Sequence, residues 1–406
     1  MKYGKLLGAA AALLAAGSTV ALAADVKVGS AAGITGPIEG LVPPILAGRD
    51  LAAAHVNEQG GILGGGTYVL VPGDSQCNPK AAVDAGTKLV NVEQVVAVIG
   101  PSCSGATNGM VQSVNIPAGV VTLSDSATAP MISFLEDNDL VFRAAPSDGY
   151  QSSALAQHVW DQGLRKIAVT YANDDYNAGL GEAFVAAFEH IGGTIAGKQA
   201  HEPDRQSYRS ELATLAGGGA EALAVFAYYG GSGITILRNS LENALFDQFL
   251  GADGMMDNSV IEQLGADTLR GKITLSQPAP QAEGDSGPGE SYTAFAEAFK
   301  AAGHDPEAPY VAHGYDVAFL MALAIEKAGA ADRSKISAAL REVANAPGMV
   351  IRPGEWAKAR EAIAAGEDVN YEGASGDIEF DENGDVAVAT YSFNGVGDDG
   401  TWTPMQ

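Results

Sequence analysis

The stretch from Val95 to Pro130 constrains the fold more than any other part of the sequence. It contains an apolar run, VVAVIG, the loop PSCSGAT, and a second apolar run that ends in SDSATAP. An apolar run that gives way to Gly, Ser and Thr predicts a buried strand that delivers a polar loop to the start of a helix. Two such loops on neighbouring parallel strands would face one crevice, where ligands bind in open α/β sheets.

The hydroxyl side chains of these two loops are candidate ligand contacts: Ser102, Ser104, Thr107, Ser124, Ser126 and Thr128. Backbone N–H groups at helix starts have no partner within the helix, so hydroxyls and N–H groups together suit a carboxylate or another small anion. Each hydroxyl taken singly is equally consistent with an ordinary helix N-cap, which Ser and Thr favour. The prediction of a site therefore depends on the cluster.

The succession of strand, polar loop and helix recurs along the chain. It begins at VKVGSAAGITGP, breaks at FRAAPSDGYQS, and restarts with the apolar run at Lys166–Tyr171. Such recurrence predicts an α/β fold with parallel sheets flanked by helices, and the restart indicates a second lobe. The chain has 406 residues, which is longer than a domain with a single hydrophobic core normally is. Two lobes joined by several crossings would form a hinged cleft.

Three later segments carry more local predictions. The run from Tyr310 to Lys327 is apolar almost all round, which indicates a helix inside a core. The sequence DIEFDENGDVAVATYSF predicts a hairpin that turns at Glu382-Asn383-Gly384. The segment Gly348–Asp368 is interpreted as an added helical excursion on the surface.

The first 23 residues are typical of a secretory signal peptide. Lys2 and Lys5 precede an apolar segment, and Ala21-Leu22-Ala23 forms a small-x-small cleavage site. A membrane anchor is the alternative, but the apolar segment is short for a spanning helix. No cysteine lies near the cleavage point, so a lipid anchor is not expected. We therefore expect a soluble protein in an exported compartment.

Charge and cysteine content narrow the function further. Removing the two lysines of the signal takes the formal charge from −26 to −28, and a surface so acidic repels nucleic acids. Cys77 and Cys103 are the two cysteines of the chain, and in an oxidising compartment an isolated pair most simply forms a disulfide. A metal site is the alternative, but no histidine lies near them and their spacing fits no zinc pattern.

In order along the chain, several motifs resemble those of one family: GITGP, DSQCNPKAAV, IGPSCSGAT, SDSATAP, YANDDYNAG, YYGG and GADGMMD. The mature chain resembles the periplasmic solute-binding proteins of branched-chain amino acid ABC transporters, of the Leu/Ile/Val-binding type. The resemblance implies a type I periplasmic-binding-protein fold: two Rossmann-like lobes with parallel sheets flanked by helices and three hinge crossings. The lobes would comprise residues 25–145 plus 277–372, and 146–276 plus 373–406. It also implies a disulfide between Cys77 and Cys103.

The same resemblance implies a ligand site. Ser104 matches a serine that binds the ligand carboxylate, and Ser126, Ala127 and Thr128 match a loop that contacts the carboxylate and the amino group. The second lobe would contribute two tyrosines that close over the ligand and an acid, namely Tyr176, Tyr229 and Asp253. The acid stands where amino acid binders carry a glutamate that pairs with the ammonium, and it is one methylene shorter. Leu41 stands roughly where leucine binders carry a tyrosine.

The expected function is capture of a small amino acid or amino-acid-like solute and its delivery to an inner-membrane ABC permease. A monomer in the periplasm without cofactor or metal is expected. One alternative is a sensor-linked binding protein of the same fold for amides or organic acids. The other alternative is a hydrolase. The sequence argues against it, because it lacks the G-x-S-x-G, H-E-x-x-H, phosphate-loop and strand-linked G-x-G-x-x-G motifs.

Overall fold

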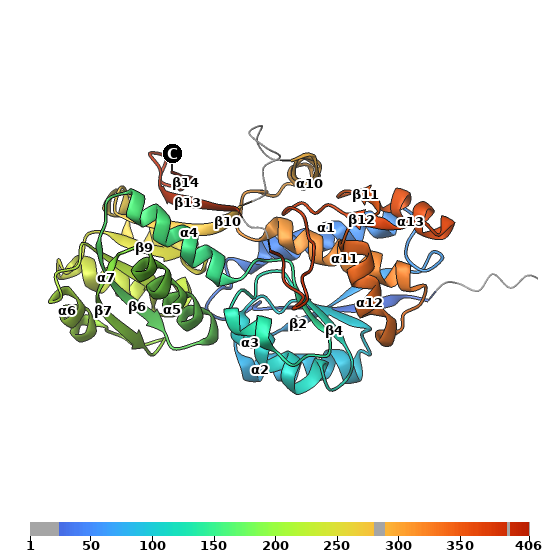
Figure 1. The fold of residues 1–406 in the computed structure, drawn as a ribbon, viewed down its shortest axis with the longest axis horizontal. Helices are drawn as coiled ribbons and strands as arrows, with labels where there is room; N and C mark the ends of the chain where they lie inside the picture. Colours follow the sequence, from blue (N-terminus) through green and yellow to red (C-terminus); the bar gives the residue numbers. More distant parts are fainter. Residues whose placement is uncertain (1–23, 280–288, 388–389, 406) are drawn as a thin grey trace, which may run out of the picture.

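The computed structural model describes residues 24–279, 289–387 and 390–405, and it divides them between two lobes that each have their own sheet (Figure 1). The predicted signal peptide lies outside the described residues. No helix among the residues described is both long and apolar enough to cross a bilayer.

The first lobe is built on a five-stranded parallel sheet with the order β2-β1-β3-β4-β5. Its strands are β1 (Val26–Ala32), β2 (Tyr68–Asp74), β3 (Ala97–Ile99), β4 (Val121–Ser124) and β5 (Val141–Arg143). Alternate residues of β3 enter different cores, because Ala97 and Ile99 join one hydrophobic cluster and Val98 joins another. A sheet buried on both faces explains why these strands read as continuous apolar runs.

Helices cover both faces of this sheet. The helices of this lobe are α1 (Val42–Glu58), α2 (Pro79–Thr87), α3 (Ser104–Met110), α10 (Glu290–Ala301), α11 (Val311–Ala328), α12 (Arg333–Ala344) and α13 (Trp356–Ala365). Every residue of α11 from Val311 to Ile325 is buried, which confirms the prediction of a core helix. Short helical turns follow three of the elements of this lobe: Lys88–Val92 follows α2, Val111–Asn115 follows α3, and Pro130–Phe134 follows β4.

The second lobe has a seven-stranded sheet with the order β14-β13-β10-β9-β8-β6-β7. Its strands are β6 (Lys166–Ala172), β7 (Thr194–His201), β8 (Ala222–Phe226), β9 (Phe249–Ala252), β10 (Ile273–Ala279), β13 (Thr390–Val396) and β14 (Trp402–Pro404). The first five are parallel, whereas β13 and β14 add antiparallel pairs at one edge. Its helices are α4 (Asp148–Asp161), α5 (Asp175–His190), α6 (Arg209–Ala216), α7 (Ile234–Glu242), α8 (Asn258–Leu264) and α9 (Ala266–Leu269), with turns at Tyr229–Gly233 and Asp253–Met255.

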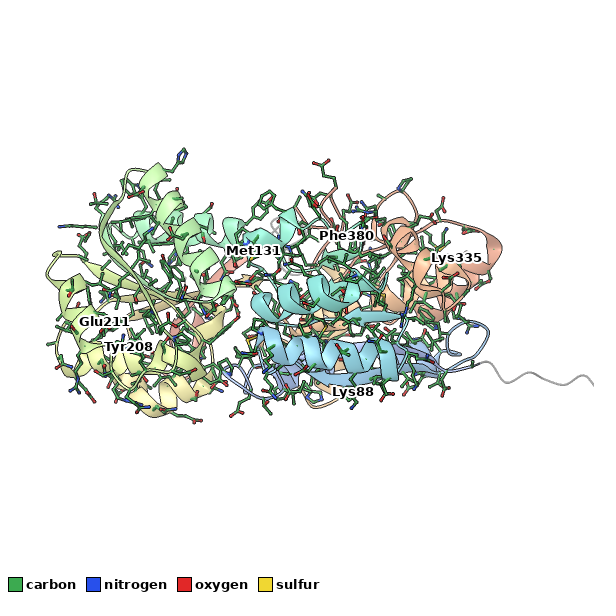
Figure 2. All side chains as sticks on the ribbon, turned by 90° about the horizontal axis from the view of Figure 1, so that it is seen from below. Lys88, Met131, Tyr208, Glu211, Lys335 and Phe380 are labelled. Carbon is green, nitrogen blue, oxygen red and sulfur yellow. A yellow bond between two sulfur atoms is a disulfide. The ribbon has the colours of Figure 1, made fainter. Side chains whose placement is uncertain are left out.

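The chain passes between the lobes after β5, after β10 and before β13, so the α/β fold with two lobes is as predicted. Two boundaries differ from the sequence-based ones. Strand β10 stays in the second sheet to Ala279, beyond the predicted boundary at 277. Residues after 372 remain with the first lobe, because Ile378, Phe380 and Val386 pack in its main core (Figure 2 shows Phe380 within that lobe).

The predicted hairpin at residues 382–384 is a turn and not a long ribbon. Gly384 adopts a φ of +74°, and one antiparallel bridge joins Phe380 to Val386 across the turn. The strand that follows, β13, pairs instead with β10 of the other lobe. The sequence pattern detected the turn, but it does not show that the chain then leaves the lobe.

The segment 348–368 belongs to the core of the first lobe, so its interpretation as a surface excursion is wrong. Trp356, at the start of α13, is fully buried, and its indole N–H donates to the Gly61 carbonyl at 3.0 Å. The flanking strands β11 (Met349–Ile351) and β12 (Val369–Tyr371) form a two-stranded parallel sheet. The buried tryptophan anchors this segment against α11 and α1.

Candidate functional site

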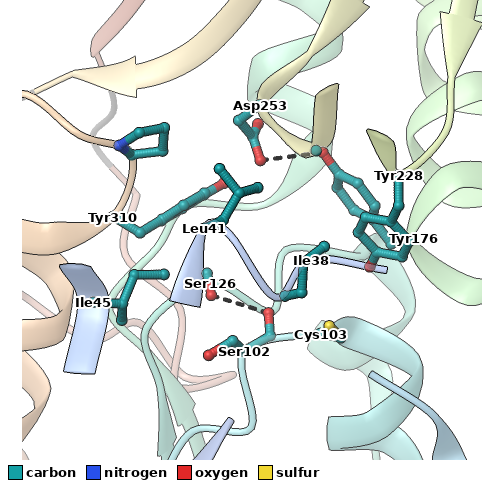
Figure 3. A pocket seen from close by; sticks show the side chains of 12 residues that line it. Ile38, Leu41, Ile45, Ser102, Cys103, Ser126, Tyr176, Tyr228, Asp253 and Tyr310 are labelled. Carbon is teal, nitrogen blue, oxygen red and sulfur yellow. Dashed lines mark hydrogen bonds between the residues drawn. The ribbon is translucent and has the colours of Figure 1, made fainter. Parts of the chain in front are cut away.

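A pocket lies between the lobes, and both lobes line it (Figure 3). The first lobe contributes Ile38, Leu41, Ile45, Ser102, Cys103, Ser126, Pro309 and Tyr310, and the second contributes Tyr176, Tyr228, Asp253 and Gly254. Figure 3 shows Asp253 on one side, Ser102 and Ser126 on the opposite side, and aliphatic side chains between them. None of the lining residues is a lysine, an arginine or a histidine.

Asp253 follows β9 and starts a short 3-10 turn at the carboxyl edge of the second sheet, as predicted for a ligand residue in a parallel sheet. Its carboxylate accepts hydrogen bonds from Gln151 Nε2 at 2.7 Å and from the Tyr176 hydroxyl at 3.2 Å. Burial raises the pKa of Asp253, and these hydrogen bonds partly offset that effect. The site therefore holds a desolvated acid that no lysine or arginine neutralises among the described residues.

Aromatic rings close the second-lobe side of the pocket. Tyr176, the second residue of α5, stacks on Tyr228 with ring centroids 5.3 Å apart. Burial raises the pKa of both phenols well above the ordinary value, so both stay neutral donors. Tyr310, which precedes α11, has a φ of +60°, a conformation uncommon for a bulky residue. That backbone places its ring in the pocket.

The hydroxyl side of the pocket comes from the two loops after β3 and β4. The Ser126 hydroxyl lies 2.9 Å from the Ser102 carbonyl oxygen and 3.0 Å from Asp125 Oδ1, which ties the loops together. Since adjacent parallel strands end at the same edge, the structure brings Ser102 and Ser126 side by side, as the sequence predicts.

The other predicted contacts of these loops lie behind this surface and do not line the pocket, namely Ser104, Thr107, Ser124, Ala127 and Thr128. The Thr107 hydroxyl donates to the Pro101 carbonyl at 2.9 Å. Ser104 Oγ accepts hydrogen bonds from the backbone N–H groups of Thr128 and Ala129, both at 3.1 Å. The Ala127 N–H donates to Ser124 Oγ at 3.0 Å. In this structure the N–H groups of Ala127 and Thr128 thus bond to serine hydroxyls of the same two loops.

Tyr229 also lies outside the pocket lining, where its neighbour Tyr228 takes the expected place. Its hydroxyl accepts a hydrogen bond from the Gly40 N–H at 2.7 Å, across the gap between the lobes. Asn108 Nδ2 on α3 similarly donates to Asp175 Oδ2 on α5 at 3.0 Å. These contacts join the lobes directly, so the structure represents a closed form of the cleft.

Arg49 on α1 holds the hydroxyl loops in place. Its guanidinium is fully buried and pairs with Asp125, whose carboxylate is also fully buried. It also donates to Ser30 Oγ at 2.8 Å and to Ser102 Oγ at 3.4 Å. No sequence motif singles out Arg49. The buried ion pair gives Asp125 a structural role in the loop after β4.

Arg143, at the end of β5, supports the second loop from the other side. It is fully buried, pairs with Asp385 at 2.5 Å, and donates to the carbonyl oxygens of Ala127 at 3.3 Å and Ala129 at 2.9 Å. No local motif marks Arg143, because its partner lies 242 residues away in the chain.

A disulfide joins Cys77 to Cys103, as predicted, with the two Cα atoms 5.4 Å apart. It connects the loop before α2 to the pocket loop at Cys103. The bond closes a chain segment with a sequence separation of 26 residues.

We expect Cys77→Ser to lower the free energy of unfolding by roughly 3–4 kcal/mol, because the unfolded chain loses the constraint of that loop. Ligand affinity should persist, since hydrogen bonds of Ser126 and Arg49 still hold the pocket loop. Thermal melting with and without reductant measures the effect, and the variant itself should not respond to reductant. An unchanged melting midpoint in the oxidised proteins would contradict the prediction.

Comparison with known proteins agrees with this architecture. The sequence profile of a family described as periplasmic binding protein matches residues 25–400. The leucine-, isoleucine-, valine-, threonine- and alanine-binding protein of Pseudomonas aeruginosa is 28% identical over 338 residues, covering 82% of this chain and 86% of that protein. The chemotactic signal transduction system substrate-binding protein BasB of Halobacterium salinarum is 28% identical over 378 residues, covering 87% and 83%.

Among solved structures, the leucine-binding protein LivK of Thermotoga maritima superimposes with a TM-score of 0.77 at 23% identity, covering 94% of this chain and 98% of that one. The two-lobed fold, the pocket between the lobes and the match over nearly the whole chain agree with one another. This chain belongs to the periplasmic binding protein family.

Proposed function

We propose that the protein is the solute-binding component of an ABC importer and captures a small α-amino acid with an apolar side chain. It binds its solute and does not convert it. The observation that carries the proposal is the arrangement in the pocket, where an unneutralised carboxylate faces serine hydroxyls across an aliphatic wall (Figure 3).

The two ends of the pocket suit the two charges of a zwitterion. Asp253 is positioned to accept hydrogen bonds from an ammonium, and such charge-assisted bonds are roughly twice as strong as neutral ones. Ser102 and Ser126, with nearby backbone N–H groups, are the candidate partners of the carboxylate. Because Ser104 Oγ already occupies the Thr128 N–H, a carboxylate that uses this donor must share it or displace Ser104 Oγ.

The charge of the pocket argues against an amine-free organic acid. Such an anion would meet the Asp253 carboxylate without a lysine, arginine or histidine among the lining residues to compensate it. Burying an uncompensated charge costs several kcal/mol. The aliphatic side chains of Ile38, Leu41 and Ile45 instead suit a leucine, isoleucine or valine side chain, in keeping with the names of the bacterial relatives.

The proposed partner is an inner-membrane permease, and the proposed location is the periplasm, reached through cleavage of the signal peptide at residues 1–23 without a lipid anchor. The protein is proposed to act as a monomer, with closure of the two lobes as the signal that the permease reads. The similarity to BasB, whose name refers to chemotactic signalling, supports a membrane sensor as the second candidate partner.

Thermal melting tests the ligand class. Protein that has been unfolded, stripped of solute and refolded is heated with leucine, isoleucine or valine, and in parallel with 4-methylpentanoate and 4-methylpentanamide. A ligand at about a hundred times its dissociation constant stabilises the folded form by roughly 2.7 kcal/mol, which raises the melting midpoint visibly.

A higher midpoint with the amino acids but not with the two amine-free analogues is the expected result. A higher midpoint only with the analogues would keep the binding role and overturn the zwitterion assignment. Release of a chemically altered solute from the complex would overturn the assignment as a binding protein.

A further inference from the structure

A second buried acid, Asp148, lies beside the pocket and has no assigned role. It is the first residue of α4, its exposed fraction is 0%, and neither carboxyl oxygen has a hydrogen-bond partner among the described residues. Gln151 lies one turn later on the same helix face and donates to Asp253. Helix α4 thus places Asp148 on the same side as Gln151, which contacts Asp253 in the pocket.

Unpartnered hydroxyls surround the two acids. Close to the acids, the buried hydroxyl groups of Thr128, Tyr310 and Tyr391 lack a hydrogen-bond partner within the described parts of the chain. Tyr310 is itself a lining residue and only 8% exposed. Buried polar groups are normally satisfied, so unpartnered groups from both lobes that converge on one place mark a polar subsite.

No described basic residue pairs with either acid. The arginine whose charge acts on Asp148 is Arg143, and its guanidinium is already engaged by Asp385, Ser133 and two loop carbonyls. Burial and the acid pair both raise the pKa of four phenols, which come from α5, the β8 end, the α11 start and β13: Tyr176, Tyr228, Tyr310 and Tyr391.

Two carboxylates buried together without a cation repel each other, and such a pair normally keeps a proton. Burial is the main reason why the pKa of Asp148 lies well above its usual value, and the charge of Asp253 adds to the effect. The nearby Thr128 hydroxyl and the positive charge of Arg143 favour the ionised form and act in the opposite direction.

We propose that Asp148 and Asp253 form one acidic subsite that holds a proton in the empty protein and exchanges it for the ammonium of the solute. This inference rests on the proposed function, because it assigns the subsite to an amine-bearing ligand. The exchange is balanced: the ammonium enters with its charge, the shared proton leaves to solvent, and no covalent bond of the solute changes. The subsite thereby selects ligands that carry a positive charge at this end.

The first test needs no ligand. Infrared difference spectroscopy between wild type and Asp148→Asn, at neutral pH and without solute, should show the C=O stretch of a protonated carboxyl in the wild type. Asp247→Asn, at an exposed position of the same lobe, is the matched control and should leave that band unchanged. Absence of the band from the wild-type protein would overturn the inference.

The second test measures the exchange with leucine as the probe. Calorimetry of wild type in buffers of different ionisation enthalpy should show release of about one proton per bound leucine, and affinity should rise up to roughly tenfold per pH unit while the pair is protonated. Asp148→Asn should abolish the proton release, whereas Asp247→Asn should retain it.

The outcomes separate this inference from the proposed function. Leucine binding without proton release would overturn the proton exchange and leave the binding role intact. Failure of every amino acid to bind would overturn the proposed function, and the infrared band of the empty protein would still decide whether the acid pair holds a proton. If Asp148→Asn fails to fold, loss of the wild-type band on addition of leucine supports the exchange, and its persistence contradicts it.

Discussion

Asp253→Asn is expected to weaken leucine binding by roughly 2–5 kcal/mol, the scale for removing one partner of a desolvated charge pair. The asparagine keeps the shape of the side chain, and its carbonyl can still accept from Gln151 or Tyr176, so the variant removes charge with little change in packing. In dissociation constants the loss corresponds to roughly 30-fold up to several thousand-fold. Isothermal titration calorimetry at neutral pH measures it.

The amine-free analogue 4-methylpentanoate provides the internal control. Its affinity should not fall in Asp253→Asn and should rise, because the variant removes a negative charge that opposes the analogue. Asp247→Asn changes the same residue type at an exposed position and should leave both affinities as they are. Equal leucine affinity in wild type and Asp253→Asn would remove Asp253 from the site.

The sequence predicts the fold well because its strands are buried on both faces and their loops contain glycine and serine. Val95–Gly100 was expected as a strand and contains β3, and the apolar run at Tyr310 contains α11. Lobe boundaries were less accurate. The last residues of the first lobe, around Phe380, and strand β13 follow one another closely in the sequence, and only long-range packing assigns them to different lobes.

The sequence motifs predict some residues of the pocket lining and miss those positions that depend on long-range packing. Ser126, Tyr176 and Asp253 line the pocket, as the motifs indicate. Tyr228 and Tyr229 are adjacent in the same motif, and only the backbone after β8 decides which ring enters the pocket. Arg49 was missed because buried arginines pair with distant partners and leave no local pattern. One sequence feature could have indicated its role: an arginine within the apolar face of a helix needs a buried partner.

Arg49→Met is expected to lower the free energy of unfolding by roughly 3–5 kcal/mol, because it leaves the Asp125 carboxylate buried without its partner. Denaturant unfolding followed by circular dichroism measures the loss. Arg209→Met is the matched control, since Arg209 pairs with Glu242 on the surface with side chains 58% and 50% exposed. An exposed pair of this kind contributes only about 0–1 kcal/mol. Similar losses in the two variants would contradict the burial argument.

The double variant Arg49→Met/Asp125→Leu separates stability from binding. Replacing both members of a buried pair by apolar residues of similar size is often neutral or stabilising, so much of the lost stability should return. Leucine affinity should remain reduced, because Asp125 Oδ1 no longer positions the Ser126 hydroxyl and Arg49 no longer reaches Ser102. Recovery of both quantities would show that the ion pair serves only the fold. Recovery of stability alone would show that the ion pair also positions the pocket loops. The loops of the double variant would then be stably packed but unable to bind leucine.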